Sequence, residues 1–527
     1  MHPTMMRTQS SLSIPTPNMD SLSIAIGHGG GVNKYPAKSH AQRVGRATGL
    51  THGSIVLAGE KQEMYSNSDQ PRHWRQDRYF YYVTGCNEPN CYVTYDLEKD
   101  HLTLWLPPVG SLREVFYMGR GSTVEEAMEK YDIDEAKYLP ESKEGYVGFE
   151  DALKRFRDQA AAGSCFYYQS KLDVPQPWND TVCKPAHLHT ALDNCRAVKD
   201  QDEIALIKKA NDVSSQAHLK ILQSLRNITT EAQAEGLFMF YCIAAGAKEQ
   251  AYGPIMGSGP NAATLHYQAN NEAFGNRQVL LVDASCEWEL YAADITRTIP
   301  LNPKKPGYWP SSEAEALYKA VEKIQEEAIN MLKPGVKFND VHWHAAHMAI
   351  DALLELGILK GDHMDIFHSG IYAAFAPHGL GHMIGLEVHD VKSVRPSEDP
   401  QDVAGAYAAY VARTNSKYAA KPGFSEAKHF HMDLQILRAP NTLESPPLEA
   451  GNVVTIEPGL YFNELILRAV LSDPEQRKHI DADVLKRYMA VGGVRIEDDI
   501  LITKSGYENL TKALKGEEML KAIRGAA

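Results

Sequence analysis

Two aspartates in one short stretch, Asp283 and Asp294, could act together chemically. Each adjoins an apolar run, and the midpoint between them falls between Trp288 and Glu289. If those two residues form a hairpin turn, the aspartates face each other with Cβ atoms about 4.5–5.5 Å apart. Carboxylates that close repel, so one holds a proton or a cation lies between them. The turn lacks glycine and asparagine, and a single strand aspartate is commonly a hydrogen-bonded edge residue, so both interpretations stay open here.

Three histidines follow within twelve residues and are interspersed with glycines: His378, His382 and His389. The glycines argue against a helical metal motif and favour extended or turning backbone. A lone histidine is more often a hydrogen-bonded core residue than a ligand. Three together favour a metal site, because imidazole binds transition metals and glycine lets the backbone approach a crowded site closely.

Two further acids lie near predicted strands. Glu457 follows the apolar run Val453–Ile456 and precedes Pro458, where a strand passes into a turn. Glu497 lies inside a run predicted to be a strand, and Arg495 two positions before it shares its face. Taken locally, Arg495 and Glu497 could equally form a surface ion pair.

The elements that must position these residues change character along the chain. Residues 1–45 are rich in Ser, Pro, Gly, Asn and Met, which predicts a disordered lead-in. Alternating strands and helices predict an N-terminal α/β domain over 46–190, and a large α+β domain follows over 191–527. Within that domain, residues 392–436 have little periodicity and are typical of a long inserted loop.

Specific segments carry this prediction. Apolar residues three and four apart after Asp200 predict the first long helix of the larger domain, with acidic residues in its first turn. Further helices are predicted over 124–130, 151–161, 230–244, 312–332 and 339–356. Strands are predicted over 54–58, 91–95, 102–106, 279–283, 293–299, 453–457 and 494–503.

Composition restricts the class of protein. The chain has 527 residues, a net charge of −13 and 43% hydrophobic residues, so nothing basic indicates a nucleic-acid partner. No apolar run is long enough to span a membrane, and the N-terminus has no compact apolar segment typical of a signal peptide. Seven cysteines without a Cys-x-x-Cys pair predict reduced, mostly buried thiols. A cytoplasmic protein is expected.

Together these residues resemble a known family. The set Asp283, Asp294, His382, Glu457 and Glu497 is similar to the metal ligands of the pita-bread metallopeptidases. The sequences around those ligands, the stretch 257–267 that contains His266 and the N-terminal stretch 75–91 resemble the proline-specific branch, which comprises Xaa-Pro aminopeptidase and prolidase. The resemblance covers about residue 46 to the end. It implies an α+β protein with a C-terminal pita-bread (creatinase/aminopeptidase) fold preceded by a smaller α/β domain.

The resemblance also implies a mechanism with two divalent metal ions per chain. Four carboxylates and one imidazole favour Mn²⁺, with Fe, Co or Zn as alternatives. Asp294 and Glu497 would bridge the ions, Asp283 would complete one, and His382 and Glu457 the other. The ions would activate water to hydroxide. The further roles implied are Glu457 as general base, His266 and His389 as hydrogen-bond donors to substrate, His378 in positioning substrate, Arg495 in orienting the acids, and Arg438 in binding a substrate carboxylate.

The expected function is hydrolysis of the bond between an N-terminal residue and a penultimate proline. The alternatives are a dipeptidase for Xaa-Pro (prolidase) and, more remotely, a non-catalytic pita-bread binding protein or a metal-free creatinase-like hydrolase. The chain departs from the family pattern at Ser285 and Leu290, where relatives usually have glycine, and in the length of 392–436. The resemblance also implies a homodimer formed through the N-terminal domain, with a peptide substrate and neither nucleic acid nor membrane as partner.

Overall fold

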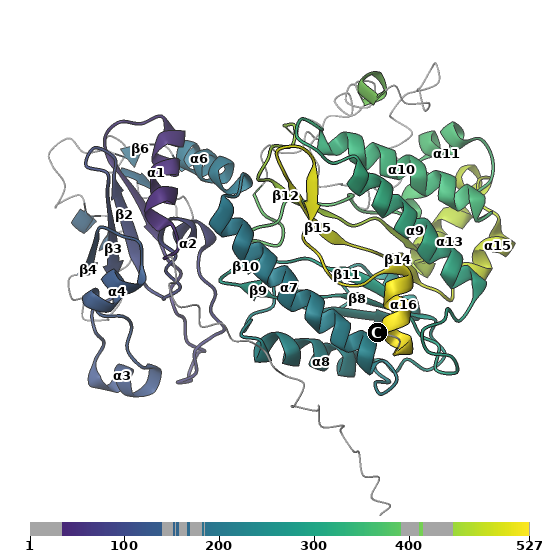
Figure 1. Ribbon diagram of the computed structural model, residues 1–527, viewed down its shortest axis with the longest axis horizontal. Helices are drawn as coiled ribbons and strands as arrows, with labels where there is room; N and C mark the ends of the chain where they lie inside the picture. The colour runs from purple at the N-terminus through teal and green to yellow at the C-terminus, as the bar shows by residue number, and fades with distance from the viewer. Residues whose placement is uncertain are drawn as a thin grey trace, which may run out of the picture. The chain divides into compact units, whose positions relative to one another are not determined.

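The computed structural model describes residues 34–139, 151–152, 154–156, 166–168, 182–183, 185–391, 410–414 and 446–525. All of them belong to one compact unit. Figure 1 shows an N-terminal sheet with its helices, followed by a larger region of small sheets and longer helices. Among the described residues, no helix is both long and apolar enough to cross a membrane.

The N-terminal region is built on a six-stranded mixed sheet in the order β4-β3-β2-β1-β5-β6. Its central strands β1 to β3 form an antiparallel meander, and the outer strands pair in parallel. The strands are β1 (Ser54–Ala58), β2 (Tyr92–Asp96), β3 (His101–Leu106), β4 (Glu135–Tyr138), β5 (Phe166–Tyr168) and β6 (Val182–Cys183). The helices are α1 (Ala37–Thr48), α2 (Arg78–Thr84), α3 (Leu112–Met118), α4 (Val124–Lys130) and α6 (Pro185–Ala197).

The described chain is ordered earlier than the sequence predicts. The expected lead-in extended to residue 45, but α1 begins at Ala37 and buries His40, Ala41 and Val44. The buried side of this helix includes only three apolar side chains, Ala37, Ala41 and Val44, and polar residues lie between them, so the sequence shows little helical periodicity. Residues 1–33 lie outside the described residues.

The boundary predicted at 190/191 falls inside α6, which runs to Ala197 and packs against α1. The next helix, α7 (Gln201–Ser224), begins where the sequence predicts. Asp200 caps it, accepting from the backbone N–H of Asp202 and Glu203, while Glu203 bonds back to the Asp200 N–H. This capping box provides acceptors for N–H groups at the helix start that have no carbonyl partner within the helix.

The C-terminal region consists of small antiparallel sheets covered by helices. Its sheets have the strand orders β11-β8-β7, β12-β15-β16, β13-β14 and β10-β9. The strands are β7 (Ile255–Ser258), β8 (Val279–Asp283), β9 (Glu287–Trp288), β10 (Tyr291–Ala292), β11 (Thr296–Pro300), β12 (Val453–Ile456), β13 (Gly459–Tyr461), β14 (Gly493–Arg495), β15 (Asp498–Ile502) and β16 (Tyr507–Asn509). A backbone bridge between Thr296 and Glu497 joins the first of these sheets to the β14–β15 segment.

Helices pack on these sheets and enclose the main core, which includes Phe238, Leu280, Val321, Ile350 and Ile500. The α-helices are α7, α8 (Glu231–Ala244), α9 (Ser312–Asn330), α10 (Phe338–Glu355), α11 (His363–Ser369), α13 (Glu464–Ser472), α14 (Pro474–Arg477), α15 (Ala482–Tyr488) and α16 (Gly516–Arg524). Short 3-10 helices are η3 (Gly259–Ala263) and η4 (Ile371–Ala374). The predicted strand over 494–503 is in fact two strands, because the chain leaves the ladder at Ile496 and Glu497.

The predicted insertion at 392–436 lies almost entirely outside the described residues. Only residues 410–414 of it are described, and they are helical. Tyr410 is buried in the main core, and Arg413 bonds to both carboxylate oxygens of Asp340 on α10. This short segment is therefore attached to α10.

Candidate metal centre and active site

The hairpin that carries Asp283 and Asp294 turns one position later than the sequence predicts. β9 and β10 pair Trp288 with Tyr291, so Glu289 and Leu290 form the turn. Both have positive φ, +48° and +65°, as a two-residue turn matched to the strand twist requires. Neither is glycine or asparagine, which is why the sequence does not reveal the turn. Leu290 is only 7% exposed, so its burial holds the turn in place.

The predicted face-to-face pairing of Asp283 with Asp294 is therefore wrong. Asp283 pairs with Thr296 instead. The backbone hydrogen bond from Ala284 N–H to the Ile295 carbonyl keeps the same register. Moving the turn by one residue moves the cross-strand partner by two, and residues two apart share a face. Asp294 is thus a diagonal neighbour of Asp283 on one face, close enough for side chains to interact.

His382 and Glu457 lie on two neighbouring segments that are paired by backbone hydrogen bonds. Residues 380–384 run beside β12, with Thr455 N–H donating to the His382 carbonyl and Glu457 N–H to the Leu380 carbonyl. The approach is so close that a Cβ on Gly381 would lie 2.0 Å from the Thr455 carbonyl oxygen. The expectation that glycine permits a crowded backbone here is confirmed.

Three predicted ligands lie together. Donor atoms of Asp294, His382 and Glu497 are all within 4.8 Å of one another. His382 Nε2 is 3.4 Å from Asp294 Oδ2 and 3.6 Å from Glu457 Oε1. Its Nδ1 is 3.0 Å from the Met383 carbonyl, and donation there leaves Nε2 facing the carboxylates, as in metal-binding histidines.

Burial and mutual repulsion shift the pKa values of these acids. Burial raises the pKa of Asp283, Glu457 and Glu497, and nearby carboxylates add to the rise. The pKa of Glu457 reaches about 7, and that of Glu497 lies well above its usual range. Burial is also the largest single effect on Asp294 and acts to raise its pKa, but the interactions with His382, Tyr252 and His389 together outweigh it and lower the pKa. Burial opposes protonation of His382, yet Asp294 and Glu457 outweigh it and raise the pKa of His382 to about 9.

The site fits divalent cations. Asp283 Oδ1 and Glu497 Oε1 are buried without a hydrogen-bond partner among the described residues. A buried, unpartnered carboxylate oxygen is costly. Cations among four acids and one imidazole would satisfy these oxygens and remove the repulsion.

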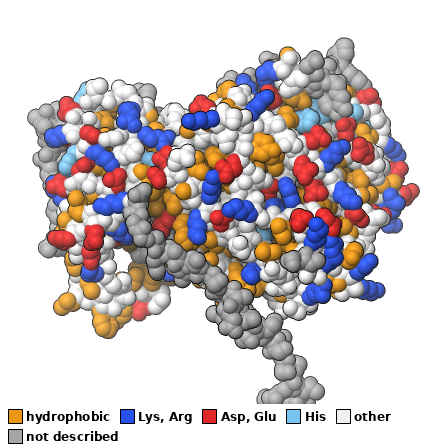
Figure 2. All heavy atoms as spheres, viewed as in Figure 1, with side chains coloured by type: hydrophobic (Ala, Val, Ile, Leu, Met, Phe, Trp, Pro, Cys, Tyr) orange, Lys and Arg blue, Asp and Glu red, His pale blue; other side chains and the backbone are white. Residues whose placement is uncertain are grey.

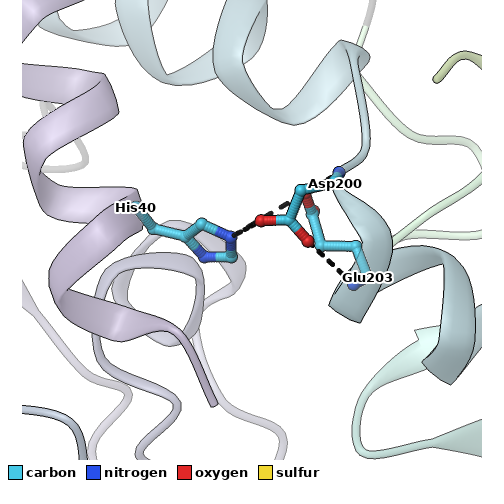
Figure 3. Close-up of side chains that lie close together, drawn as sticks. All are labelled: His40, Asp200 and Glu203. Carbon is cyan, nitrogen blue, oxygen red and sulfur yellow. Dashed lines mark hydrogen bonds and ion pairs between the residues drawn. The ribbon is translucent and has the colours of Figure 1, made fainter. Parts of the chain in front are cut away.

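A second cluster of similar composition does not fit a metal. Figure 3 shows His40 of α1 pointing at Asp200 and Glu203 at the start of α7. His40 Nδ1 is bonded to the Tyr82 carbonyl and Nε2 to Asp200 Oδ2, at 2.8 Å each. The Arg43 guanidinium lies 3.6 Å from Glu203 and 3.8 Å from Asp200, so these carboxylates already have a cation.

The histidines predicted to contact substrate lie around the acids. His389 is exposed, and the centroid of its ring lies 4.1 Å from the centroid of the His382 ring. His378 Nδ1 is 3.8 Å from Glu457, and burial lowers the pKa of His378 to about 3, so this imidazole is neutral. His266 is exposed in the turn after η3 and is near enough to His378 to repel its charged form. Arg438 lies outside the described residues.

Arg495 connects several parts of the site. Its guanidinium donates to Asp283 Oδ2, to Thr296 Oγ1 at 3.2 Å and to the Tyr461 hydroxyl at 2.8 Å. It reaches Glu497 only through Thr296, whose hydroxyl donates to Glu497 Oε2 at 2.7 Å. Arg495 is thus hydrogen-bonded directly to Asp283 and is connected to Glu497 through Thr296.

Four further residues of the site were not predicted from the sequence. The Tyr252 hydroxyl donates to Asp294 Oδ1 at 2.6 Å, and the Tyr461 hydroxyl bonds to His378 Nε2 at 2.7 Å. Asp499 accepts from the Asp294 N–H at 3.0 Å, and Thr296 bonds Glu497 as above. Strand alternation places Thr296 and Asp499 two positions from a ligand and could have indicated them. No local pattern points to Tyr252 or Tyr461.

Glu231 at the start of α8 fixes the segment that carries His266. Its fully buried carboxylate accepts from Ser258, Asn261 and Tyr267 side chains and from the Glu272 N–H. Glu231→Ala is expected to lower the free energy of unfolding by about 3 kcal/mol or more, because several buried donors lose their acceptor. Urea denaturation followed by circular dichroism measures this. Glu235→Ala, one turn along α8 and partly exposed, is the control, and an equal effect of both would contradict the role of Glu231.

Known proteins match both regions of the chain. The sequence model of metallopeptidase family M24 matches residues 205–504. That of the aminopeptidase P N-terminal domain matches residues 40–149. A probable Xaa-Pro aminopeptidase of Pyrenophora tritici-repentis is 45% identical over 505 residues, covering 93% of this chain and 72% of that protein. Another, of Talaromyces stipitatus, is 41% identical and covers 97% of this chain and 95% of that protein.

A solved structure extends the similarity to three dimensions. A histidine-to-alanine variant of Escherichia coli aminopeptidase P matches with a TM-score of 0.69 and 25% identity, covering 93% of this chain and 98% of that one. The predicted α+β class, with a pita-bread fold after a smaller N-terminal domain, is confirmed. Because the family model matches more than half of the chain and the relatives are similar over nearly its whole length, the chain belongs to metallopeptidase family M24, in the group that carries an aminopeptidase P N-terminal domain.

Proposed function

We propose that this chain is a metal-dependent aminopeptidase that hydrolyses the bond between an N-terminal residue and a following proline. The observation that carries the proposal is the convergence of Asp294, His382 and Glu497 around carboxylate oxygens that have no hydrogen-bond partner in the described part of the chain. The names of the relatives, probable Xaa-Pro aminopeptidases, support the choice of substrate.

The proposed ligands are Asp294 and Glu497 for both ions, Asp283 for one, and His382 and Glu457 for the other. The predominance of carboxylate oxygens favours Mn²⁺. Two divalent ions held there would supply a water acidic enough to ionise near neutral pH. Arg495, Thr296 and Tyr252 bond to the carboxylates and keep them in place.

The protein's own groups account for the proton transfers. Glu457 is proposed to accept a proton from the attacking water and return it to the leaving proline nitrogen. His389 and His266 are proposed to donate hydrogen bonds to the substrate carbonyl as it gains negative charge. Neutral His378, bonded to Tyr461, is proposed to position the substrate. The bond before proline has no N–H that a protease could bind. A site that binds the substrate carbonyl and the amino end does not need this N–H.

Peptides of defined length test the proposal. With Mn²⁺ present, the protein is expected to cleave Ala-Pro-Ala after alanine and to leave Ala-Ala-Ala intact. A protein that cleaves the dipeptide Ala-Pro but not Ala-Pro-Ala would instead be a prolidase. A protein that binds no metal and cleaves neither peptide would be a non-catalytic member of the family, and the proposal would be wrong.

Domain limits and location complete the proposal. We place an N-terminal domain up to about residue 197 and a catalytic domain after it, since α6 packs on α1 and α7 packs on the catalytic sheets. A cytoplasmic location is supported by the buried, free cysteines among the described residues, Cys86, Cys91, Cys195, Cys242 and Cys286.

Dimerisation through the N-terminal domain is supported by α3. None of its residues is buried, and Leu112 and Phe116 are 91% and 85% exposed. Figure 2 shows hydrophobic side chains gathered where α3 lies. The double variant Leu112→Glu, Phe116→Glu is expected to convert a dimer to a monomer in analytical ultracentrifugation, because charges would be buried in the interface.

Leu465→Glu is the matched control for this experiment, since Leu465 is also exposed, at 77%, but lies on α13. Its sedimentation should equal that of the wild type. A wild-type protein that sediments as a monomer at micromolar concentration would contradict the dimer.

A further inference from the structure

Buried charges of the N-terminal domain contact both loops that carry the candidate metal ligands. One is the hairpin between Asp283 and Asp294, which contains Glu287 on β9. The other is the segment from His382 to His389, which contains Glu387. The Ala292 N–H donates to the Gly385 carbonyl at 2.8 Å, so the two loops also touch each other.

Arg78 lies at this junction. It is the first residue of α2, which packs against β1 and β2 of the N-terminal sheet, and it is 4% exposed. Its Nη2 donates to Glu287 Oε1 at 2.7 Å, and its Nε lies 3.5 Å from Glu387 Oε1. One guanidinium therefore joins both ligand-bearing loops to the N-terminal domain.

Neighbouring ion pairs act on the same two loops. Arg75 also bonds to Glu287, so the hairpin has a second ion pair with the N-terminal domain. Asp390, next to His389, bonds to Arg196 at 2.6 Å and Lys199 at 2.9 Å, and all three residues are buried. Arg78 differs from these groups because it alone among them contacts an acid in each loop.

We propose that Arg78 is a positioning residue of the metal centre, which fixes the separation of the Asp283–Asp294 hairpin from the His382–His389 loop through Glu287 and Glu387. The proposal rests on the proposed function. The proposed ions would take Asp283 and Asp294 from one loop and His382 from the other, so a change in loop separation would move these ligands relative to one another. Residues that orient metal ligands typically contribute about 10- to 100-fold to metal affinity.

The planar fork of arginine is essential to this role. Lysine carries the same charge on one nitrogen and cannot bond two carboxylates in fixed directions. Arg78→Lys should therefore lose most of the positioning effect, and Arg78→Met should lose all of it. Glu387→Gln removes the charge from the Arg78–Glu387 ion pair only. It should have a smaller effect, because the Glu387 side chain is 50% exposed.

The experiment uses the full-length, metal-stripped protein titrated with Mn²⁺ by calorimetry. Arg78→Met is expected to weaken Mn²⁺ binding by about 10- to 100-fold. In the metal-free state, amide hydrogen exchange is expected to speed up in both residues 284–293 and 383–391. With Ala-Pro-Ala, kcat should fall by a larger factor than KM rises. Arg72→Met is the control, since Arg72 is half-exposed and pairs with Glu63.

Two results would count against the proposal. Mn²⁺ affinity within about twofold of wild type, with only a lower thermal midpoint, would show that Arg78 is merely structural, while the proposed function would stand. If Arg78→Met does not fold, Arg78→Lys decides by the same thresholds. A wild-type protein that binds no Mn²⁺ would overturn the proposed function itself and this proposal with it.

Discussion

Asp294→Asn is expected to lower kcat/KM for Ala-Pro-Ala by roughly 10³-fold or more. Asparagine keeps the size of the side chain and can keep the Tyr252 hydrogen bond to its oxygen. It removes the negative charge and puts an NH₂ group where an oxygen faces His382 or Tyr252. Metal ions stabilise a transition state by several kcal/mol, and each 1.4 kcal/mol corresponds to a factor of ten in rate.

Metal content must fall with activity if Asp294 is a bridging ligand. Elemental analysis after dialysis against Mn²⁺ should give two ions per wild-type chain and fewer in Asp294→Asn. Asp483→Asn, an exposed position in the first turn of α15, should retain both ions and full activity. A variant at Asp294 with two ions and activity within tenfold of wild type would rule out the assigned role.

The fold was predictable where local patterns are strong. Helix α7 begins with acidic residues in its first turn and continues with apolar residues three and four apart, and the structure has a helix there. Strands β1 and β8 match the apolar runs that predicted them. Such segments obey local rules because their own side chains bury one face.

The site was predictable as a set of residues but not as a geometry. Glu289 and Leu290 adopt positive φ without being glycine or asparagine, so turn chemistry could not fix the hairpin register. Tertiary packing of Leu290 decides it instead. Strand periodicity kept Asp283 and Asp294 on one face despite the error, so the two aspartates still share the face predicted for them.

Long-range contacts account for most of what the sequence did not indicate. Tyr252 bonds to Asp294 from 42 positions away, and Arg78 reaches Glu287 across 209 positions. Neither tyrosine nor arginine is unusual in its own segment. Such roles exist only once the fold brings the segments together.

Mn²⁺ is expected to bind at least about tenfold more tightly at pH 8 than at pH 6, because ligands must lose their protons before they bind metal. In the metal-free protein, burial among other acids raises the pKa of Glu457 to about 7, and Asp294 and Glu457 raise that of His382 to about 9. At pH 6 both groups therefore hold protons that binding must release. Raising the pH removes this cost, so affinity increases with pH and does not decrease.

Calorimetric titration in two buffers of different ionisation enthalpy measures the number of protons released. Between pH 6 and pH 7 we expect between one and two protons per chain from His382 and Glu457 together, and fewer from this pair near pH 8 as Glu457 has already ionised. Glu497 adds to the total, because its pKa is also raised. His382→Ala should release fewer protons at every pH, because the imidazole that carries one of them is gone. Asp483→Asn leaves the site intact and should reproduce the wild-type values. An Mn²⁺ affinity that is constant from pH 6 to pH 8 would mean that the raised pKa values belong to groups outside the metal site, and the ligand assignment would then be wrong.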